Sequence, residues 1–127
     1  ENPIARYNLG RLLVADNRPA EAVTNFIVAL RQRPDVAEIH FEFGNALARL
    51  GNDAEALAQF AEAVRLKPDL VDARFNYGVA LARSGRYTEA ATEFRETLRL
   101  RPQHPLAQHM LDEVLQTAQP ARVPAKN

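Results

Sequence analysis

Apolar and small residues recur along this chain with the period of an α-helix. Two neighbouring segments, 39–50 and 56–64, each carry a stripe of residues spaced by one, three or four positions, which places the stripe on one helical face. The stripes consist of Ile39, Phe43, Ala46, Leu47 and Leu50, and of Ala56, Leu57, Phe60, Ala63 and Val64. No window shows the strict alternation that is typical of a half-buried strand. The pattern predicts an all-α chain.

The same landmarks return every 34 residues, as Gly10, Gly44 and Gly78 illustrate. The aligned sets are Leu9-Gly10, Phe43-Gly44 and Tyr77-Gly78; Ala22, Ala56 and Ala90; Phe26, Phe60 and Phe94; and Pro34, Pro68 and Pro102. A fixed period of this length indicates a repeat architecture. The chain is therefore predicted to contain three units of two helices each.

Each unit is predicted to turn at a residue that tolerates a positive φ at the end of its first helix. These residues are Asn17, Gly51 and Gly85. After the middle turn, Asn52 precedes Glu55 by three positions, which is the arrangement of a capping box at the start of a helix. The second helix of each unit is expected to end before the repeated proline, because proline cannot extend a helix.

The order of these landmarks resembles the tetratricopeptide repeat family, whose signature runs W-x₂-L-G-x₂-Y, then A-x₃-F, then P. The signature tryptophan is replaced here by Arg6, His40 and Arg74, and leucine stands at the tyrosine position, but the register is intact. The resemblance implies a right-handed α-solenoid of three helical hairpins, at residues 3–36, 37–70 and 71–104.

Residues 105–118 restart the pattern of a first helix, and no second helix is predicted after them. Pro105 stands at a position that suits the first turn of a helix, and Leu111 and Leu115 have the spacing of the earlier first helices. Gln108, Asp112, Glu113 and Gln116 make much of this helix polar. We expect a C-terminal capping helix, because a terminal repeat needs a polar outer face. The tail, 119–127, contains two prolines and no apolar period, and we expect it to be disordered.

The first helix opens on Pro3 and Ile4 without an evident polar cap. Glu1 and Asn2 stand where an earlier repeat would end, and the numbering does not begin at Met, so we interpret the sequence as a fragment of a longer protein. An uncapped first hairpin would expose apolar side chains such as Leu9. A homo-oligomer formed through this hairpin is therefore one expectation.

Charge and composition exclude several kinds of partner. The sixteen basic and sixteen acidic residues cancel, so no global field attracts nucleic acid or anionic lipid. No apolar run approaches the roughly 20 residues that a membrane span requires. We expect neither nucleic-acid binding nor direct membrane insertion. Cysteine is absent, which excludes disulfides and thiolate-bound zinc.

Catalytic and metal-binding motifs are also missing. His104 and His109 are five residues apart and do not have the i, i+4 spacing of two ligands on one helix face. The sequence contains neither a G-x-S-x-G motif nor a phosphate-binding glycine loop. Arg31, Arg65 and Arg99 form a ladder, but Glu62 and Glu96 lie three residues before the last two, so local ion pairs explain it. We predict no enzyme activity, no cofactor and no metal.

The family resemblance implies that the first helices line a concave groove that binds a peptide or a partner protein. The corresponding positions here are Tyr7, Asn8, Arg11, Glu38, Phe41, Glu42, Asn45, Arg49, Asp72, Phe75, Asn76, Val79 and Arg83, with His109, Met110 and Glu113 added by the cap. An aromatic residue recurs at one position of each unit, as Tyr7, Phe41 and Phe75, and either anchors a ligand or packs as a spacer. Asparagine amides suit an extended peptide backbone.

Two features of this groove restrict its ligand. Some family members clamp the C-terminal carboxylate of a chaperone peptide, but the matching positions here hold Tyr7, Arg11, Glu42, Asp72 and Asn76, which lack most of that clamp. A chaperone tail is therefore not expected. Glu38, Glu42, Asp72 and Glu113 instead favour a ligand of some basic character.

Two hypotheses of function stay open on these grounds. The first is a peptide-binding or assembly scaffold, one module of a larger bacterial protein, since the chain is rich in arginine and poor in lysine. The second is a substrate-recruiting arm of an enzyme, for example a glycosyltransferase, whose catalytic part lies outside this chain. Both would use the same groove.

Overall fold

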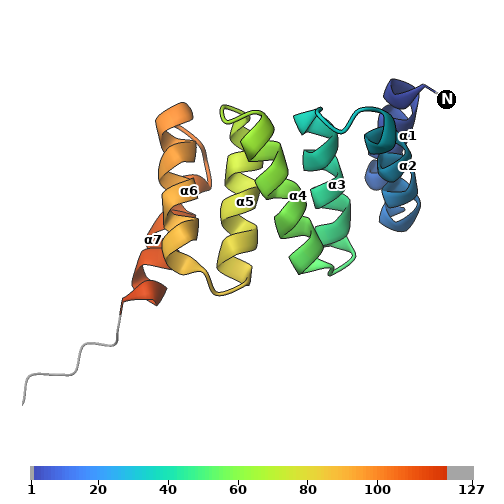
Figure 1. Cartoon of the computed structure of the whole chain (residues 1–127). Coiled ribbons are helices and arrows are strands. Elements are labelled where there is room, and N and C mark those ends of the chain that lie inside the picture. The colour runs from blue at the N-terminus through green and yellow to red at the C-terminus, as the bar shows by residue number, and fades with distance from the viewer. Residues whose placement is uncertain (1, 120–127) are drawn as a thin grey trace, which may run out of the picture.

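The computed structural model describes residues 2–119, which form seven α-helices and no strand. The helices are α1 (Pro3–Ala15), α2 (Pro19–Gln32), α3 (Ala37–Arg49), α4 (Asp53–Leu66), α5 (Val71–Arg83), α6 (Tyr87–Leu100) and α7 (Ala107–Ala118). They form three consecutive hairpins, with α7 beside α6 at the C-terminal end of the row (Figure 1). The predicted all-α repeat fold is confirmed.

Each hairpin is closed by a glycine of its first helix against a phenylalanine of its second helix. A Cβ atom built on Gly44 would lie 2.7 Å from Cε1 of Phe60, which is closer than non-bonded carbons approach. The same contact recurs between Gly10 and Phe26 and between Gly78 and Phe94. The glycine therefore lets two antiparallel helices meet closely while the ring fills the space beside them.

The core continues from one hairpin to the next. The rings of Phe26 and Phe43 are 6.5 Å apart between centroids, although they belong to different hairpins. Ala29 of α2 and Ala46 of α3 are fully buried in the same cluster. Neighbouring hairpins thus bury one another's faces, as expected for a solenoid in which each repeat contacts only its neighbours.

The turns inside the hairpins follow the prediction, whereas the predicted capping box does not form. Asn17, Gly51 and Gly85 have φ values of 59°, 79° and 82°. Within the described residues, the Asn52 side chain makes no capping hydrogen bond. The Asn52 backbone N–H already donates to the Leu47 carbonyl at 2.9 Å, so it is not available to a side chain three residues later.

The start of α1 also differs from the prediction, because this helix does have a polar cap. Asn2 Oδ1 accepts hydrogen bonds from the backbone N–H groups of Ile4 at 2.8 Å and of Ala5 at 3.4 Å. Asn2 has an extended backbone and Pro3 occupies the first turn, which is the usual geometry of a capped N-terminus.

The capping helix is shorter than predicted, since α7 begins at Ala107 and Pro105 precedes it. His104 Nδ1 accepts from the backbone N–H groups of Leu106 at 3.3 Å and of Ala107 at 3.2 Å, so this side chain caps the helix. Gln119 follows α7 in an extended conformation. Most of the tail that we expected to be disordered, 120–127, lies outside the described residues.

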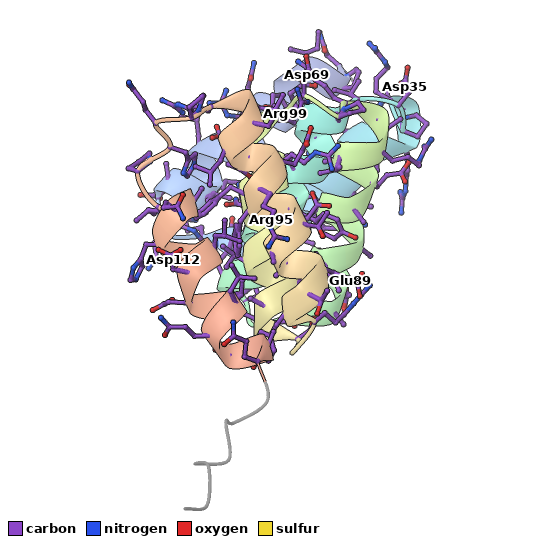
Figure 2. All side chains as sticks on the ribbon, turned by 90° about the vertical axis from the view of Figure 1, so that its left-hand side faces the viewer. Asp35, Asp69, Glu89, Arg95, Arg99 and Asp112 are labelled. Atoms are coloured by element: carbon purple, nitrogen blue, oxygen red, sulfur yellow. The ribbon has the colours of Figure 1, made fainter. Side chains whose placement is uncertain are left out.

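The two faces of α7 differ in polarity. Leu111 and Val114 are buried against the third hairpin. Asp112 occupies the position that holds Gly10, Gly44 and Gly78 in the other first helices, and it lies at the end of the molecule formed by α6 and α7 (Figure 2). Its Oδ1 accepts a hydrogen bond from Gln108 Nε2 at 3.0 Å, so this face is polar.

Candidate functional site

The predicted groove residues lie on α1, α3, α5 and α7, and several pairs from neighbouring helices meet. Arg11 Nε lies 3.7 Å from Glu42 Oε1 across α1 and α3. Asn76 Nδ2 donates to Asn45 Oδ1 at 2.7 Å across α3 and α5. We call the surface formed by α1, α3 and α5 the first-helix face. Its predicted residues are Tyr7, Asn8, Arg11, Glu38, Phe41, Glu42, Asn45, Arg49, Asp72, Phe75, Asn76, Val79 and Arg83.

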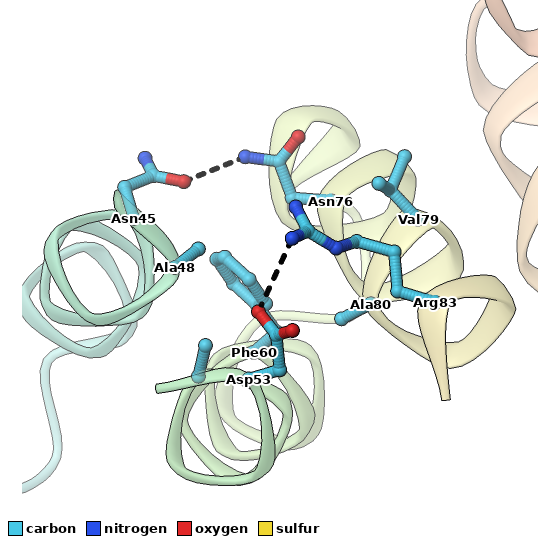
Figure 3. Close-up of a pocket in the computed structure, with 9 residues that line it drawn as sticks. Asn45, Ala48, Asp53, Phe60, Asn76, Val79, Ala80 and Arg83 are labelled. Atoms are coloured by element: carbon cyan, nitrogen blue, oxygen red, sulfur yellow. Dashed lines mark hydrogen bonds and ion pairs between the residues drawn. The ribbon is translucent and has the colours of Figure 1, made fainter. Parts of the chain in front are cut away.

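A hollow of about 180 Å³ opens between α3 and α5, above α4 (Figure 3). We call it the central hollow, and its lining residues are Asn45, Ala48, Asp53, Ala56, Phe60, Asn76, Val79, Ala80 and Arg83. Its interior is formed by alanines, Val79 and the Phe60 ring. Two polar pairs flank it, namely Asn45 with Asn76 and Asp53 with Arg83, whose charged atoms are 3.5 Å apart.

A second hollow, of about 540 Å³, lies between α1 and α3 and has a different chemistry. Arg11, Glu42 and Arg49 line it together with Asn8. Arg49 donates to the Val14 carbonyl at 3.5 Å, and the Arg11 guanidinium lies 5.6 Å from the centre of the Tyr7 ring. Burial raises the pKa of the Tyr7 hydroxyl above its ordinary value, and the Glu42 carboxylate adds to the rise. This part of the first-helix face is charged.

The acidic residues of the predicted site have cationic neighbours that the sequence did not reveal. Lys67 Nζ donates to Glu38 Oε1 at 2.9 Å, and this hydrogen bond holds the pKa of Glu38 below its ordinary value. Glu42 lies beside Arg11, and Glu113 Oε1 lies 3.3 Å from His109 Nε2. Because Lys67 and Arg11 partly neutralise Glu38 and Glu42, these two cations weaken the expected preference for a basic ligand.

The repeated aromatic residues pack inside their own hairpins. The ring centroids of Tyr7 and Phe26, of Phe41 and Phe60, and of Phe75 and Phe94 are 6.3, 6.2 and 5.6 Å apart. The Phe75 ring also meets the His104 ring at 4.5 Å. All three residues are half-buried. These contacts favour the role of spacer over that of ligand anchor.

The residues that replace the signature tryptophan form a set of cross-helix polar pairs that sequence reasoning missed. Arg6 bonds Asn25 at 3.1 Å, His40 bonds Gln59 at 2.8 Å, and Arg74 bonds Glu93 at 2.9 Å. Each pair is separated by 19 residues, and that constant spacing between polar residues was the signal available in the sequence.

Two of these side chains also reach the preceding hairpin. His40 Nε2 lies 2.8 Å from the Pro34 carbonyl oxygen, and Arg74 Nε donates to the Pro68 carbonyl at 3.0 Å. Arg74 and its partner Glu93 have side chains only 17% and 13% exposed. His40 and Arg74 therefore tie the second and third hairpins to the loops before them, and they serve structure rather than a ligand.

The arginine ladder is explained as predicted. Arg65 pairs with Glu62, and Arg99 pairs with Glu96, each through two hydrogen bonds. These pairs lie on the exposed surfaces of α4 and α6, where an ion pair contributes little to stability, about 0–1 kcal/mol. The ladder needs no anionic ligand.

Among residues 2–119, no group of three or more histidine, aspartate and glutamate side chains is arranged to hold a metal ion. None of the helices that the structure describes is both long and apolar enough to cross a membrane.

Comparisons with known proteins agree with this architecture. The sequence model of a family described as Tetratricopeptide repeat matches residues 7–71 and 54–105. A search among curated proteins gave no match. Among solved structures, the first TPR of Spaghetti (RPAP3), bound to the HSP90 peptide SRMEEVD, has a TM-score of 0.87 and 20% identity, over 91% of both chains.

Two further structures are similar. The Arabidopsis OM64 TPR domain has a TM-score of 0.86 and 22% identity, over 91% of this chain and 95% of that domain. YrrB, described as a TPR protein with an unusual peptide-binding site, has 33% identity and a TM-score of 0.78, over 86% of this chain and 56% of its own.

Proposed function

We propose that this chain, which belongs to the tetratricopeptide repeat family, binds a peptide segment of a partner protein on its first-helix face. The observation that carries the proposal is the convergence of side chains from successive first helices into two adjoining hollows. The hollows combine apolar surface with side-chain amides and charges, a mixture that suits a polypeptide ligand.

The similar structures support a peptide as the class of ligand. The Spaghetti repeat domain is bound to a peptide, and YrrB is described as having a peptide-binding site. The first-helix face lacks most of the carboxylate clamp, since Tyr7, Glu42 and Asp72 stand at clamp positions. The proposed ligand is therefore an internal segment of a partner, and its free C-terminus is not the recognised group.

Repeats of this family are typically protein-interaction modules without catalytic activity. A substrate-recruiting arm of an enzyme such as a glycosyltransferase would use the same face, because recruitment and scaffolding both require only binding. The two functions differ in what lies outside this chain. The function proposed here is the one that both share, the binding of a peptide segment on the first-helix face.

Replacing Asn45 and Arg49 together by alanine is expected to weaken peptide binding about tenfold or more, which corresponds to about 1.4 kcal/mol and suits a central hot spot. The ligands for this test are peptides selected from a random library displayed on phage, and the measurement is isothermal titration at fixed salt. Both side chains lie on α3 at the border of the two hollows. Phe41 is left intact because its ring packs against Phe60.

The matched control is Arg65→Ala on α4, whose side chain is exposed and pairs only locally with Glu62. This variant should bind the selected peptides like the wild type, and all variants must melt at similar temperatures. Equal affinity of the wild type and the double variant, with a loss in Arg65→Ala, would place the site on the second helices and refute the proposal.

One exposed apolar surface favours a second function, association of two copies of the chain. Ile4, Leu9 and Leu12 of α1 are 61%, 45% and 68% exposed, and we call these three residues the α1 face. Leu9 and Leu12 correspond by the 34-residue repeat to Phe43 and Ala46. The preceding hairpin buries that pair, leaving Phe43 9% and Ala46 0% exposed. Within residues 2–119 no hairpin covers the α1 face, and we propose that a second copy of the chain does.

Leu12→Glu is expected to raise the dimer dissociation constant by about tenfold or more, because a buried leucine contributes roughly 1.5–3 kcal/mol and a buried carboxylate is costly. Sedimentation velocity over a range of concentrations measures it. Ile27→Glu, which changes an exposed isoleucine on α2, should leave the mass distribution of the wild type unchanged. A wild type that is monomeric at every concentration would rule out this function.

A further inference from the structure

We infer, on the basis of the proposed function, that the central hollow is a pocket for one apolar side chain of the bound peptide. In this arrangement the Asn45–Asn76 pair holds the peptide main chain beside the pocket. A bound peptide must then carry an apolar residue at the position that enters the central hollow.

The size and lining of the central hollow fit a phenyl ring or a branched aliphatic group. Its volume is about 180 Å³, and Ala48, Ala56, Phe60, Val79 and Ala80 form its apolar surface. An apolar protein cavity of about 150 Å³ stays dry and binds benzene. The central hollow is open to solvent and not enclosed, but its lining is also mostly apolar, so an apolar side chain can displace poorly bound water from it.

A comparison between hairpin interfaces shows that this space is specific to the second and third hairpins. In the first hairpin, the residues that correspond to Ala48 and Phe60, 34 positions earlier, are Val14 and Phe26. Val14 is buried and Phe26 is fully covered, so the larger valine occupies the space that Ala48 leaves open. The hollow between α1 and α3 consequently does not reach Phe26.

Asn45 and Asn76 form the mouth of the central hollow, and they also differ from the residues at the same repeat positions between α1 and α3. Asn45 and Asn76 correspond to Arg11 and Glu42, which form an ion pair between α1 and α3. At the central hollow the same two positions carry neutral amides joined at 2.7 Å (Figure 3). The mouth is therefore neutral, and it suits the main chain of a peptide better than a charged side chain.

The Asn45–Asn76 pair retains one amino group and one carbonyl oxygen for that main chain. Asn76 Nδ2 and Asn45 Oδ1 bond each other, and within residues 2–119 no partner engages Asn45 Nδ2 or Asn76 Oδ1. If both amides were flipped, the pair would still use one amino group and one carbonyl and leave the other two. A peptide unit offers the complementary C=O and N–H groups.

The Asp53–Arg83 pair disfavours a charged ligand residue in the pocket. Arg83 and Asp53 lie 3.5 Å apart and are about half exposed, so each neutralises the other at this edge. The floor of the hollow is apolar, the amides of Asn45 and Asn76 are neutral, and the charges of Asp53 and Arg83 balance each other. A carboxylate or an ammonium group placed in the hollow would therefore find no buried charge of opposite sign. The recognised residue is therefore apolar.

A direct test uses amino-acid amides as probes, without any selected peptide. N-acetyl-phenylalanine methylamide and N-acetyl-leucine methylamide, at millimolar concentration, are expected to shift the ¹H–¹⁵N signals of Ala48, Asn76 and Ala80. The alanine analogue should bind at least about tenfold more weakly, because it buries several fewer carbon atoms. Equal shifts for all three probes, or shifts located elsewhere, would overturn the inference.

Two variants that fill the pocket complete the test. Ala48→Val introduces the residue that the first hairpin carries at the same position, the buried Val14, so the fold has a precedent for it. Ala80→Leu adds volume from α5, and its melting temperature must match that of the wild type before its binding is compared. Each is expected to weaken binding of the phenylalanine probe about tenfold or more, by removing the volume that the ring would occupy. Ala58→Leu, on the exposed surface of α4, is the matched control and should bind like the wild type.

The phage-selected peptides separate this inference from the proposed function. Enrichment of phenylalanine, leucine or isoleucine at one peptide position, with affinity lost in both pocket variants, supports the pocket. If peptides depend on Asn45 and Arg49 but tolerate both pocket variants, the pocket is wrong while the first-helix face stands. If no selected peptide depends on the first-helix face, the proposed function itself fails.

Discussion

Phe60→Ala is expected to destabilise the protein by about 3–5 kcal/mol, the range found when a buried aromatic ring is removed from a core. Phe60 is only 3% exposed, lies against Gly44, and meets the Phe41 ring at 6.2 Å. A row of hairpins has a thin core, so losing the ring in the central hairpin affects both neighbours. Urea denaturation followed by circular dichroism measures the free energy of unfolding.

A double-mutant cycle with Gly44 makes the same prediction more specific. Gly44→Ala alone should cost about 1–3 kcal/mol, because its methyl group would overlap the Phe60 ring. In the Phe60→Ala background the methyl group has room and alanine is the better helix former by about 1 kcal/mol, so the cost should vanish or reverse. A surface truncation on the neighbouring part of α4, Arg65→Ala, should cost less than about 1 kcal/mol, because the side chain is exposed.

Either of two results would contradict this account of the hairpin. A loss below about 1 kcal/mol for Phe60→Ala, well under the range for a buried ring, would show that the ring does not close α3 against α4. Additive effects of Gly44→Ala and Phe60→Ala would show that the two positions are not in contact.

Removing α7 is the second change with a large expected effect. Ending the chain after His104 should destabilise the third hairpin by about 3–6 kcal/mol, since the buried side chains of Leu111 and Val114 contribute roughly 1.5–3 kcal/mol each. The newly exposed cluster around Leu81 and Phe94 should also lower solubility, as loss of a terminal cap does in repeat proteins. Thermal melts and the soluble fraction after expression measure the two effects.

Point variants on the two faces of α7 provide the control. Leu111→Ala should cost about 2–5 kcal/mol because the side chain is buried. Asp112→Ala, on the outer face, should change stability by no more than about 0.5 kcal/mol. A truncated protein as soluble and as stable as the full chain would show that α7 is not the cap of this array.

Several features that sequence reasoning missed share one physical cause, which is competition for the same backbone groups. The capping box at Asn52 fails because the turn at Gly51 has already used the Asn52 N–H. The start of α7 is set by the His104 side chain, which accepts from two N–H groups. A motif in the sequence shows which residues can form a cap, but only the folded backbone shows which donors are still free.

The surroundings of the first-helix face were predicted less well than the fold. The positions of the first-helix face followed from the repeat, but the packing of Phe41 on Phe60 and the pairing of Glu38 with Lys67 did not. Those contacts decide which side chains remain available to a partner. The central hollow exists because position 48 holds alanine where the first hairpin holds the larger Val14. The space that alanine leaves open becomes a hollow only when two hairpins are stacked.

The sequence by itself determined the helices, their order and their register. Helical period, turn residues with positive φ, and the pairing of Gly44 with Phe60 at a fixed spacing are local properties that repeat every 34 residues. The tertiary structure alone decided which residues meet between hairpins. Asn45–Asn76 and Arg11–Glu42 are both 31 residues apart, yet that spacing has no meaning in an isolated helix. Two residues at this spacing meet only because neighbouring first helices pack at a particular angle and offset. The volumes of all the side chains between these helices set that angle and offset.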